Sequence, residues 1–359
     1  MSSPPPGRSL GQPLYLPQLR TNLADCIATA VAGQIVHPLV RGTPYRIGRD
    51  GTIRVVPGSG GIVYNRRVGD PARGLVGDHV EPGVSLRNND RDHLGGPGAA
   101  NRAFLAYSCI GNRATVVSGP ALGAHGRVIG KHGGINHVIV DFDPRILRAL
   151  RIGDRIQVQA WGQGLALADY PSVRPLNLSP TLLRRWGIRR HGPHLHVPVT
   201  HVVPAGLMGS GLGRPDGVLG DCDIQLSNPA INRRFRLDSL RMGDLVALAP
   251  LDFRHGPSQR PDVLTIGVIV HSDSNVAGHG PGVTPLLVGP ASVLRPWFRP
   301  DANLARVLAL RDHIAPIPTP SARERAEVWR LAAHGEAVSA ALAVQSKRRA
   351  VPPAPVGAS

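Results

Sequence analysis

The chain is short of the residues that build helices. The chain has 359 residues, and the part before Ser321 contains only one glutamate, Glu81, and one lysine, Lys131. Glycine (43) and proline (35) are abundant in the chain as a whole. Glutamate, lysine and methionine favour helices, whereas glycine and proline interrupt them. We therefore expect strands and turns to dominate, in a mainly β or α+β fold with two β-rich, barrel-like lobes and a C-terminal helix.

Shifts in composition predict how the chain is divided. A proline-rich segment near residues 170–180 has no clear periodicity and is the predicted boundary between the lobes. Ser321-Ala-Arg-Glu324 matches a capping box, which predicts the start of an amphipathic helix. The predicted units are a flexible arm (1–18), an N-terminal lobe (19–172), a C-terminal lobe (173–318), the helix (319–346) and a flexible tail (347–359).

Two stretches, 150–160 and 240–249, share the frame Leu-Arg-apolar-Gly-Asp followed by apolar residues. A tight Gly-Asp turn that opens a half-buried strand has this pattern, with Ile156 and Val158 facing inward in the first copy. Two related β-rich lobes and two independent turns of a common type explain the repeat equally well. In either case each Asp can cap its turn through the backbone.

The basic character of the chain suggests a nucleic-acid partner. The formal charge is +17, and all but two of the 41 basic residues are arginine. Basic surfaces gain affinity for nucleic acid by releasing counterions from phosphate. Aromatic residues are only 4% of the chain, so stacking platforms for single strands are poorly supplied. We therefore expect a generic basic surface more than a nucleic-acid-binding protein.

The cysteines and the absence of apolar runs predict the compartment. Cys26, Cys109 and Cys222 are widely spaced, odd in number and form no CxxC pair, which favours a reducing environment over a disulfide framework or a zinc ribbon. No signal sequence and no run near the roughly 20 apolar residues of a membrane span are found. We expect a cytoplasmic protein outside the membrane; a homo-oligomer is left open.

Three pairs of ligand-type side chains at i and i+2 lie beside glycines that bend the backbone: His79/Glu81, Asp221/Asp223 and His271/Asp273. Residues at this spacing in a strand point to the same side and can converge on one ion. Mixed imidazole and carboxylate sets bind divalent metals such as zinc or magnesium. The predicted metal ligands are His79, Asp221, Asp223, His271, Asp273 and His279.

Glycine-marked turns also surround the rare charged residues. Glu81 is the predicted general base, and Lys131 with His132 would hold or polarise the substrate. Cys109 is a candidate nucleophile, with a buried structural cysteine as the alternative. The predicted catalytic residues are Glu81, Lys131, His132 and Cys109; the predicted substrate-binding residues are Gly130, Gly133, Gly134, Gly209, Ser210 and Gly211. All are expected to meet in one pocket.

Four histidines form a further cluster that follows several arginines. We expect it to be a solvated basic loop outside the site. These histidines are His191, His194, His196 and His201.

Eight motifs together carry a family resemblance. They are Gly77–Ser85, Ser108–Asn112, Gly130–Gly134, Gly162–Leu165, Met208–Gly213, Gly220–Gln225, Gly267–Asp273 and Gly278–Val283. In this order, from about residue 22 to 314, they resemble a prokaryotic family known only as a domain of unknown function (family 4438). The resemblance implies no reaction, but it implies that these positions form one site and that residues 191–196 lie outside it. Cys222 stands where an aromatic residue is usual in the family, so no packing role is inferred for it.

The leading hypothesis from the sequence is a metal-assisted hydrolase, or a lyase built from the same parts, that acts on a small anionic or amide-containing molecule. The metal would supply a water nucleophile near neutral pH. The competing hypothesis is a non-catalytic RNA- or metabolite-binding protein that uses the arginine-rich surface and the glycine loops.

Overall fold

The computed structural model describes residues 19–39, 46–90 and 98–334. The predicted arm at 1–18, the tail at 347–359 and the last part of the predicted helix, 335–346, lie outside these ranges.

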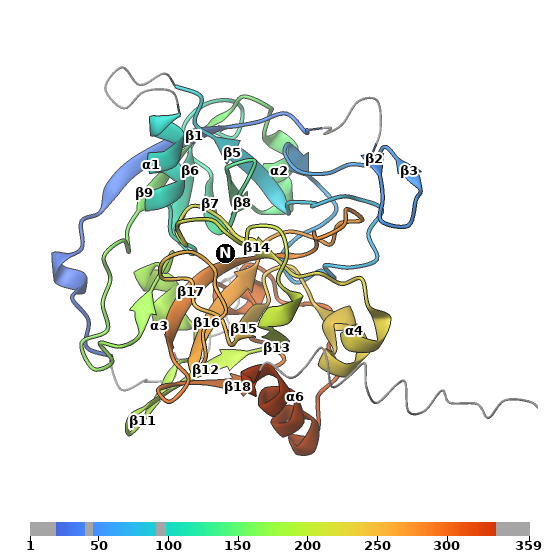
Figure 1. The fold of residues 1–359 in the computed structure, drawn as a ribbon. Helices are drawn as coiled ribbons and strands as arrows, with labels where there is room; N and C mark the ends of the chain where they lie inside the picture. Colours follow the sequence, from blue (N-terminus) through green and yellow to red (C-terminus); the bar gives the residue numbers. More distant parts are fainter. Residues whose placement is uncertain (1–18, 40–45, 91–97, 335–359) are drawn as a thin grey trace, which may run out of the picture.

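The N-terminal half forms a closed, antiparallel six-stranded barrel (Figure 1). Its strands pair in the order β1 (Thr29–Ile35), β9 (Arg155–Ala160), β6 (Arg113–Val116), β7 (His125–His132), β8 (His137–Asp141) and β5 (Gly83–Arg87). Pairing of Gln34 with Arg87 closes the barrel between β1 and β5. A short strand, β4 (Ile62–Val63), pairs with β5. Burial alternates strictly along β9, with Ile156 and Val158 inside, as the sequence predicted.

The C-terminal half is built on an open sheet. Its strands are β10 (Arg174–Pro175), β17 (Gly282–Pro290), β16 (Val263–Ile269), β15 (Leu245–Ala249) and β13 (His201–Pro204), in that order, with β14 (Cys222–Asp223) paired to β17. Among the described strands of this sheet, only β13 and β15 pair in parallel. The mainly β fold is therefore confirmed, but the closed barrel belongs to the N-terminal half alone. β15 is buried on both faces rather than one.

Two smaller sheets complete the β structure. β11 (Arg189–His191), β12 (His194–Val199) and β18 (Leu294–Phe298) form one, and the hairpin β2 (Arg46–Ile47) and β3 (Ile53–Arg54) forms the other. Three of the four histidines lie in the β11–β12 hairpin, so the expected loop is wrong, whereas His191 is exposed as expected and His194 and His196 are half-buried. The fourth, His201, is buried in β13.

The helices are short, and all except α1, which follows Gly98, begin at side-chain caps. They are α1 (Ala99–Tyr107), α2 (Pro144–Ala149), α3 (Pro180–Arg185), α4 (Pro229–Phe235), α5 (Leu304–Val307) and α6 (Ala322–His334), and the 3-10 turns are η1 (Leu23–Asp25), η2 (Ala205–Leu207) and η3 (Leu237–Ser239). The predicted capping box opens α6: Ser321 N donates to Glu324 at 2.6 Å, and Glu324 N donates to Ser321 Oγ at 3.2 Å. α6 packs near β13 and β15 (Figure 1).

The two Gly-Asp turns of the sequence repeat have the same local structure. Gly153 and Gly243 have φ of 91° and 82°, in the left-handed region that glycine tolerates. Asp154 accepts a hydrogen bond from Arg151 N at 2.8 Å, and Asp244 accepts one from Arg241 N at 2.9 Å. Both carboxylates therefore cap their turns.

One hydrophobic cluster runs through both halves of the molecule. It joins barrel residues such as Val84 and Ile139 to Ile266 and Leu287 of the C-terminal sheet. β16 is buried along its whole length and ends two residues before His271. None of the described helices is both long and apolar enough to cross a bilayer.

Candidate metal centre

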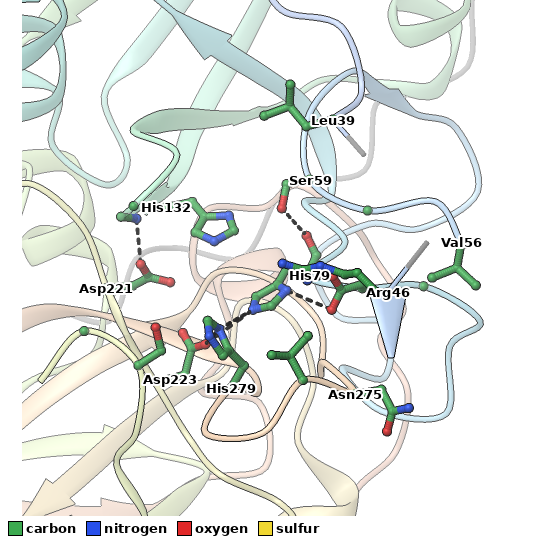
Figure 2. A pocket seen from close by; sticks show the side chains of 18 of the residues that line it. Leu39, Arg46, Val56, Ser59, His79, His132, Asp221, Asp223, Asn275 and His279 are labelled. Carbon is green, nitrogen blue, oxygen red and sulfur yellow. Dashed lines mark hydrogen bonds and ion pairs between the residues drawn. The ribbon is translucent and has the colours of Figure 1, made fainter. Parts of the chain in front are cut away.

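A cavity of about 480 Å³ lies where the barrel meets loops of the C-terminal half (Figure 2). Side chains from both halves line it. Its polar floor consists of His79, His132, Asp221, Asp223 and His279, and Gly133, Gly134, Ser210 and Gly211 lie at its edge. Six of the predicted ligand-type residues form two adjacent groups of three, in each of which the ligand atoms lie within 4.8 Å of one another.

The inner group consists of His132, Asp221 and His271, all buried. His132 ends β7, and His271 lies two residues beyond the end of the buried strand β16. The rings of these two histidines are 4.2 Å apart between centroids. Asp221 reaches across the halves, since its Oδ1 accepts a hydrogen bond of 2.7 Å from Gly133 N. This carboxylate therefore binds across the two halves and does not cap its own turn.

Two atoms of the inner group are left without hydrogen bonds. Nδ1 of His271 donates to the carbonyl of Ser272 at 2.9 Å, so a neutral ring carries a lone pair on Nε2. That Nε2 lies 2.8 Å from Oδ2 of Asp221, yet both atoms are buried and neither has a hydrogen-bond partner among the described residues. Buried polar atoms normally have partners. A cation bound by both would satisfy them.

Gly282 keeps open the space beside these two atoms. A Cβ at this position would lie 1.8 Å from Oδ2 of Asp221 and 2.3 Å from Nε2 of His271. Any side chain here would therefore occupy the place between the two ligand atoms. Position 282 therefore requires glycine, because only a residue without a side chain leaves the space between these two atoms free.

Glu81 orients the inner group and does not line the cavity. It is fully buried, and its Oε1 accepts a hydrogen bond of 2.6 Å from Nδ1 of His132. His137, Ser85 and Gly60 N also donate to this carboxylate. Burial alone would raise the pKa of Glu81, but the neighbouring His137 and His132 hold the pKa well below its ordinary value. An ionised Glu81 fixes the proton of His132 on Nδ1 and leaves Nε2 to bind a ligand.

The outer group consists of His79, Asp223 and His279. Nε2 of His79 lies 3.0 Å from Nδ1 of His279 and 3.4 Å from Oδ2 of Asp223. Nδ1 of His79 is hydrogen-bonded at 3.0 Å to Asp78, a carboxylate that plays the same orienting part as Glu81. His79 has a φ of 54°, a strained value for a residue with a side chain, of the kind that gathers at functional sites.

Asp223 connects the two groups. Its Oδ1 lies 3.6 Å from Nε2 of His271, and its Oδ2 lies 3.2 Å from Nδ1 of His279. Burial alone would lower the pKa of His271, but the carboxylates of Asp221 and Asp223 raise that pKa to about 9. The floor of the cavity is therefore a region of negative potential that attracts a proton or a metal cation.

The structure separates Lys131 from this centre and corrects the expectation of a shared pocket. Lys131 and His132 are neighbours on β7 and point to opposite sides. Nζ of Lys131 is buried and donates to Asn177 at 2.7 Å and to the carbonyl of Val218 at 2.9 Å. Burial lowers its pKa to about 8. The contacts of Lys131 tie the barrel to the C-terminal half, and its side chain does not line the cavity.

Cys109 is likewise remote from the cavity. It is fully buried, and burial raises the pKa of its thiol to about 11. A thiolate is the nucleophilic form, so these surroundings do not suit the predicted nucleophile and match the structural alternative. Asp273 belongs to neither ligand group; its carboxylate accepts from Ser274 N and Arg73.

The predicted glycines divide in the same way. Gly133, Gly134, Ser210 and Gly211 line the cavity, whereas Gly130 and Gly209 do not. A Cβ at Gly130 would lie 2.7 Å from Val270, and one at Gly209 would lie 2.1 Å from the carbonyl of Gly278. These two glycines permit close packing around the site.

Three residues of the site were not found from the sequence. His137 pairs with His132 across the β7–β8 hairpin, so the spacing of these histidines around Gly133-Gly134 was an available signal. Asp78 precedes His79 directly. Arg214 lines the cavity, but it is one of 39 arginines and no pattern distinguishes it.

Comparison with known proteins now adds to this geometry. Residues 45–184 match the N-terminal domain of unknown function DUF4438, and residues 185–308 match the C-terminal domain of the same family. A crystal structure of a protein called TM1086 is similar, with 41% sequence identity and a TM-score of 0.75 over 80% of this chain and 98% of that one. No curated protein matches. The chain therefore belongs to the DUF4438 family.

Proposed function

We propose that the protein is a divalent-metal-dependent hydrolase, with a lyase reaction as the variant that the same groups would serve. The observation that supports it is the close approach of two buried, unpartnered ligand atoms, Nε2 of His271 and Oδ2 of Asp221. His132 completes a three-residue set beside an accessible cavity. Three protein ligands with room for a further ligand are typical of catalytic sites.

The ligand chemistry favours a zinc-like ion over magnesium. Two imidazoles and one carboxylate form each group, and magnesium prefers oxygen donors and retained water. Each group also has a carboxylate behind one of its histidines, Glu81 behind His132 and Asp78 behind His79. Such carboxylate–histidine pairs raise the basicity of the ligand and fix its ring.

The outer group provides a second place for an ion. His79, Asp223 and His279 all line the cavity, and Asp223 contacts residues of both groups. Paired ions that share a carboxylate are common in enzymes that hydrolyse esters, amides and phosphates. When bound, the metal would supply Lewis acidity and an activated water. The side chains would hold the ligands in place and exclude competing solvent from the buried inner group.

Metal analysis tests the binding part of this proposal. Protein stripped with chelator and reloaded with zinc should hold a stoichiometric ion, as measured by inductively coupled plasma mass spectrometry. His271→Gln and Asp221→Asn should lose it. His201→Gln is the matched control, because His201 is also a buried histidine but lies away from the cavity. Failure of the wild type to retain any ion, with the same melting temperature in chelator, would refute the proposal.

The catalytic part needs a separate measurement. Zinc-loaded protein should hydrolyse members of a panel of p-nitrophenyl carboxylates, p-nitrophenyl phosphates and anilides, and chelator should abolish the turnover reversibly. Stoichiometric zinc without turnover of any of these substrates would favour the non-catalytic metabolite-binding alternative.

A further inference from the structure

Arg214 is a cation without a partner in the cavity wall. Two other arginines that line the cavity are paired, Arg46 with Asp78 and Arg54 with Asp50. Among the described residues no acceptor lies within hydrogen-bond or ion-pair distance of the Arg214 guanidinium. It is therefore available to an anion from solution.

The backbone leaves room for this guanidinium next to the inner group. A Cβ built on Gly133 would lie 1.8 Å from Nη1 of Arg214 and 3.2 Å from Oδ1 of Asp221. A Cβ on Gly220 would lie 2.7 Å from the same Nη1. Both glycines thus make the space in which Arg214 lies beside the ligand carboxylate. Its position allows a bound anion to contact the guanidinium and a metal ion together.

The lining of the cavity also includes apolar side chains. Of the twelve large hydrophobic residues that are exposed in the described part of the chain, four line this one cavity: Leu39, Ile47, Val55 and Leu212. Ile47 and Val55 are 66% and 67% exposed. Figure 2 shows Leu39 and Val56 across the cavity from Asp221 and Asp223. Such a concentration of exposed apolar side chains marks a binding surface.

The apolar wall is held in place. The β2–β3 hairpin, which supplies Ile47, is fixed to the loop that follows Asp273: Arg49 N donates to the carbonyl of Asn275 at 2.7 Å, and Nη1 of Arg49 donates to the carbonyl of Ser274 at 3.0 Å. A volume of about 480 Å³ suits a small organic molecule.

We propose that the cavity binds a small amphipathic molecule whose anionic head group, a carboxylate or a phosphate, contacts Arg214 and whose apolar body packs on the wall of Leu39, Ile47, Val55 and Leu212. This inference rests on the proposed function in taking the cavity as the substrate site. It narrows the substrate class to acids or phosphate esters with an apolar chain or ring.

A chain-length series tests the proposal. Isothermal titration calorimetry would compare acetate, butanoate, hexanoate and octanoate, then octyl phosphate and 1-octanol, on zinc-loaded and metal-free protein. Affinity should rise by about fourfold for each added methylene that is buried. Octanol should bind far more weakly than octanoate, and the relative affinity of octyl phosphate identifies the preferred head group.

Two variants separate the contributions. Arg214→Gln should weaken all acids by at least about tenfold, in line with a charged hydrogen bond, without changing the dependence on chain length. Ile47→Ser combined with Val55→Ser should flatten that dependence and leave acetate unchanged. Arg155→Gln and Ile27→Ser, an exposed arginine and an exposed isoleucine outside the cavity, are the matched controls.

The outcomes distinguish this inference from the proposed function. Graded binding that depends on Arg214 in metal-free protein supports the inference even if zinc never binds. If the protein binds stoichiometric zinc but has equal affinity for all acids of the series, the inference is overturned. The absence of any effect of Arg214→Gln on acid binding would also overturn it. A dimer in sedimentation analysis that dissociates in the Ile47→Ser, Val55→Ser variant would also overturn it, because the wall would then face a second copy.

Discussion

At the scale of single residues, the candidate centre depends as much on the groups behind the ligands as on the ligands. Glu81 has no exposed surface and accepts hydrogen bonds from two imidazoles, one hydroxyl and one backbone amide. A general base must reach the substrate, and this carboxylate does not. Its chemical contribution is to set the tautomer and direction of His132.

Glu81→Gln should therefore affect both folding and metal binding. The amide would place a donor against donors in a buried site, so we expect a loss of about 3 kcal/mol in the free energy of unfolding and a ten- to hundredfold loss of zinc affinity. Urea unfolding and competition with a zinc-binding dye would measure them. Glu327→Gln on α6, where Glu327 is exposed, is the control and should change neither.

Gly282→Ala tests the space beside the inner ligands. Its Cβ would meet Asp221 and His271, so zinc should be lost while the fold survives at a cost of about 1–3 kcal/mol. Gly164→Ala is the control, because no atom lies within 4 Å of its Cβ and a left-handed φ of 78° costs about 1 kcal/mol. Equal zinc content in both variants would contradict the placement of the ion.

The rarity of two residue types predicted that neither is a surface residue, but not where its side chain points. Glu81 and Lys131 are both fully buried, which fits the argument that neither is ordinary surface decoration. Composition carries no information about direction, however. Adjacent positions on one strand send Lys131 and His132 to opposite sides, and only the pairing of β7 shows which side meets the cavity.

At the scale of elements, the strands place the polar groups. The period of two predicted the buried face of β9. The expectation of a solvated loop failed for His201. Neither charge nor spacing shows that β13, which carries this histidine, is covered by α6 and paired with β15. His201 is consequently buried and neutral.

His201 gives a pH dependence that can be assigned. Burial lowers its pKa to about 4, below the value near 6.5 expected in the unfolded chain. Because the unfolded state takes up the proton first, this residue removes stability as pH falls from 6.5 to 4, by up to about 3 kcal/mol. His201→Leu should abolish that part of the loss in chemical denaturation at pH 4, 5, 6 and 7.

The substitution is suited to the test because its neighbours keep partners. Oγ of Thr200 also contacts the carbonyl of Leu245, and Oγ of Ser239 donates to the carbonyl of Arg236. Thus no hydroxyl is left unpaired by leucine. Parallel pH profiles for the two proteins would show that His201 is not the titrating group.

At the scale of the whole molecule, the centre exists only where the halves meet. His79 and His132 come from the barrel half, while Asp221, Asp223, His271 and His279 come from the other half. Sequence spacing placed five of the six among the metal ligands, whereas His132 was predicted to hold or polarise the substrate. The division of these residues into two groups could not be predicted from sequence spacing. The grouping depends on contacts between residues up to 200 positions apart.

Zinc should stabilise the whole molecule as one unit. The hydrophobic cluster is continuous across both halves, so we expect a single thermal transition whose unfolding free energy rises by about 2.7 kcal/mol at a zinc concentration one hundred times the dissociation constant. Differential scanning calorimetry with and without chelator measures this. Two separate transitions, with only one responding to zinc, would show instead that the ligands belong to one half.

The hydrogen bond from Gly133 N to Asp221, which joins the two halves, has a consequence for how the sequence evolves. A chimera that joins the first half of one family member to the second half of another must match a carboxylate from one parent to a backbone amide and an imidazole from the other. Neither half can drift in this region without a compensating change in its counterpart, so the two segments are expected to evolve together.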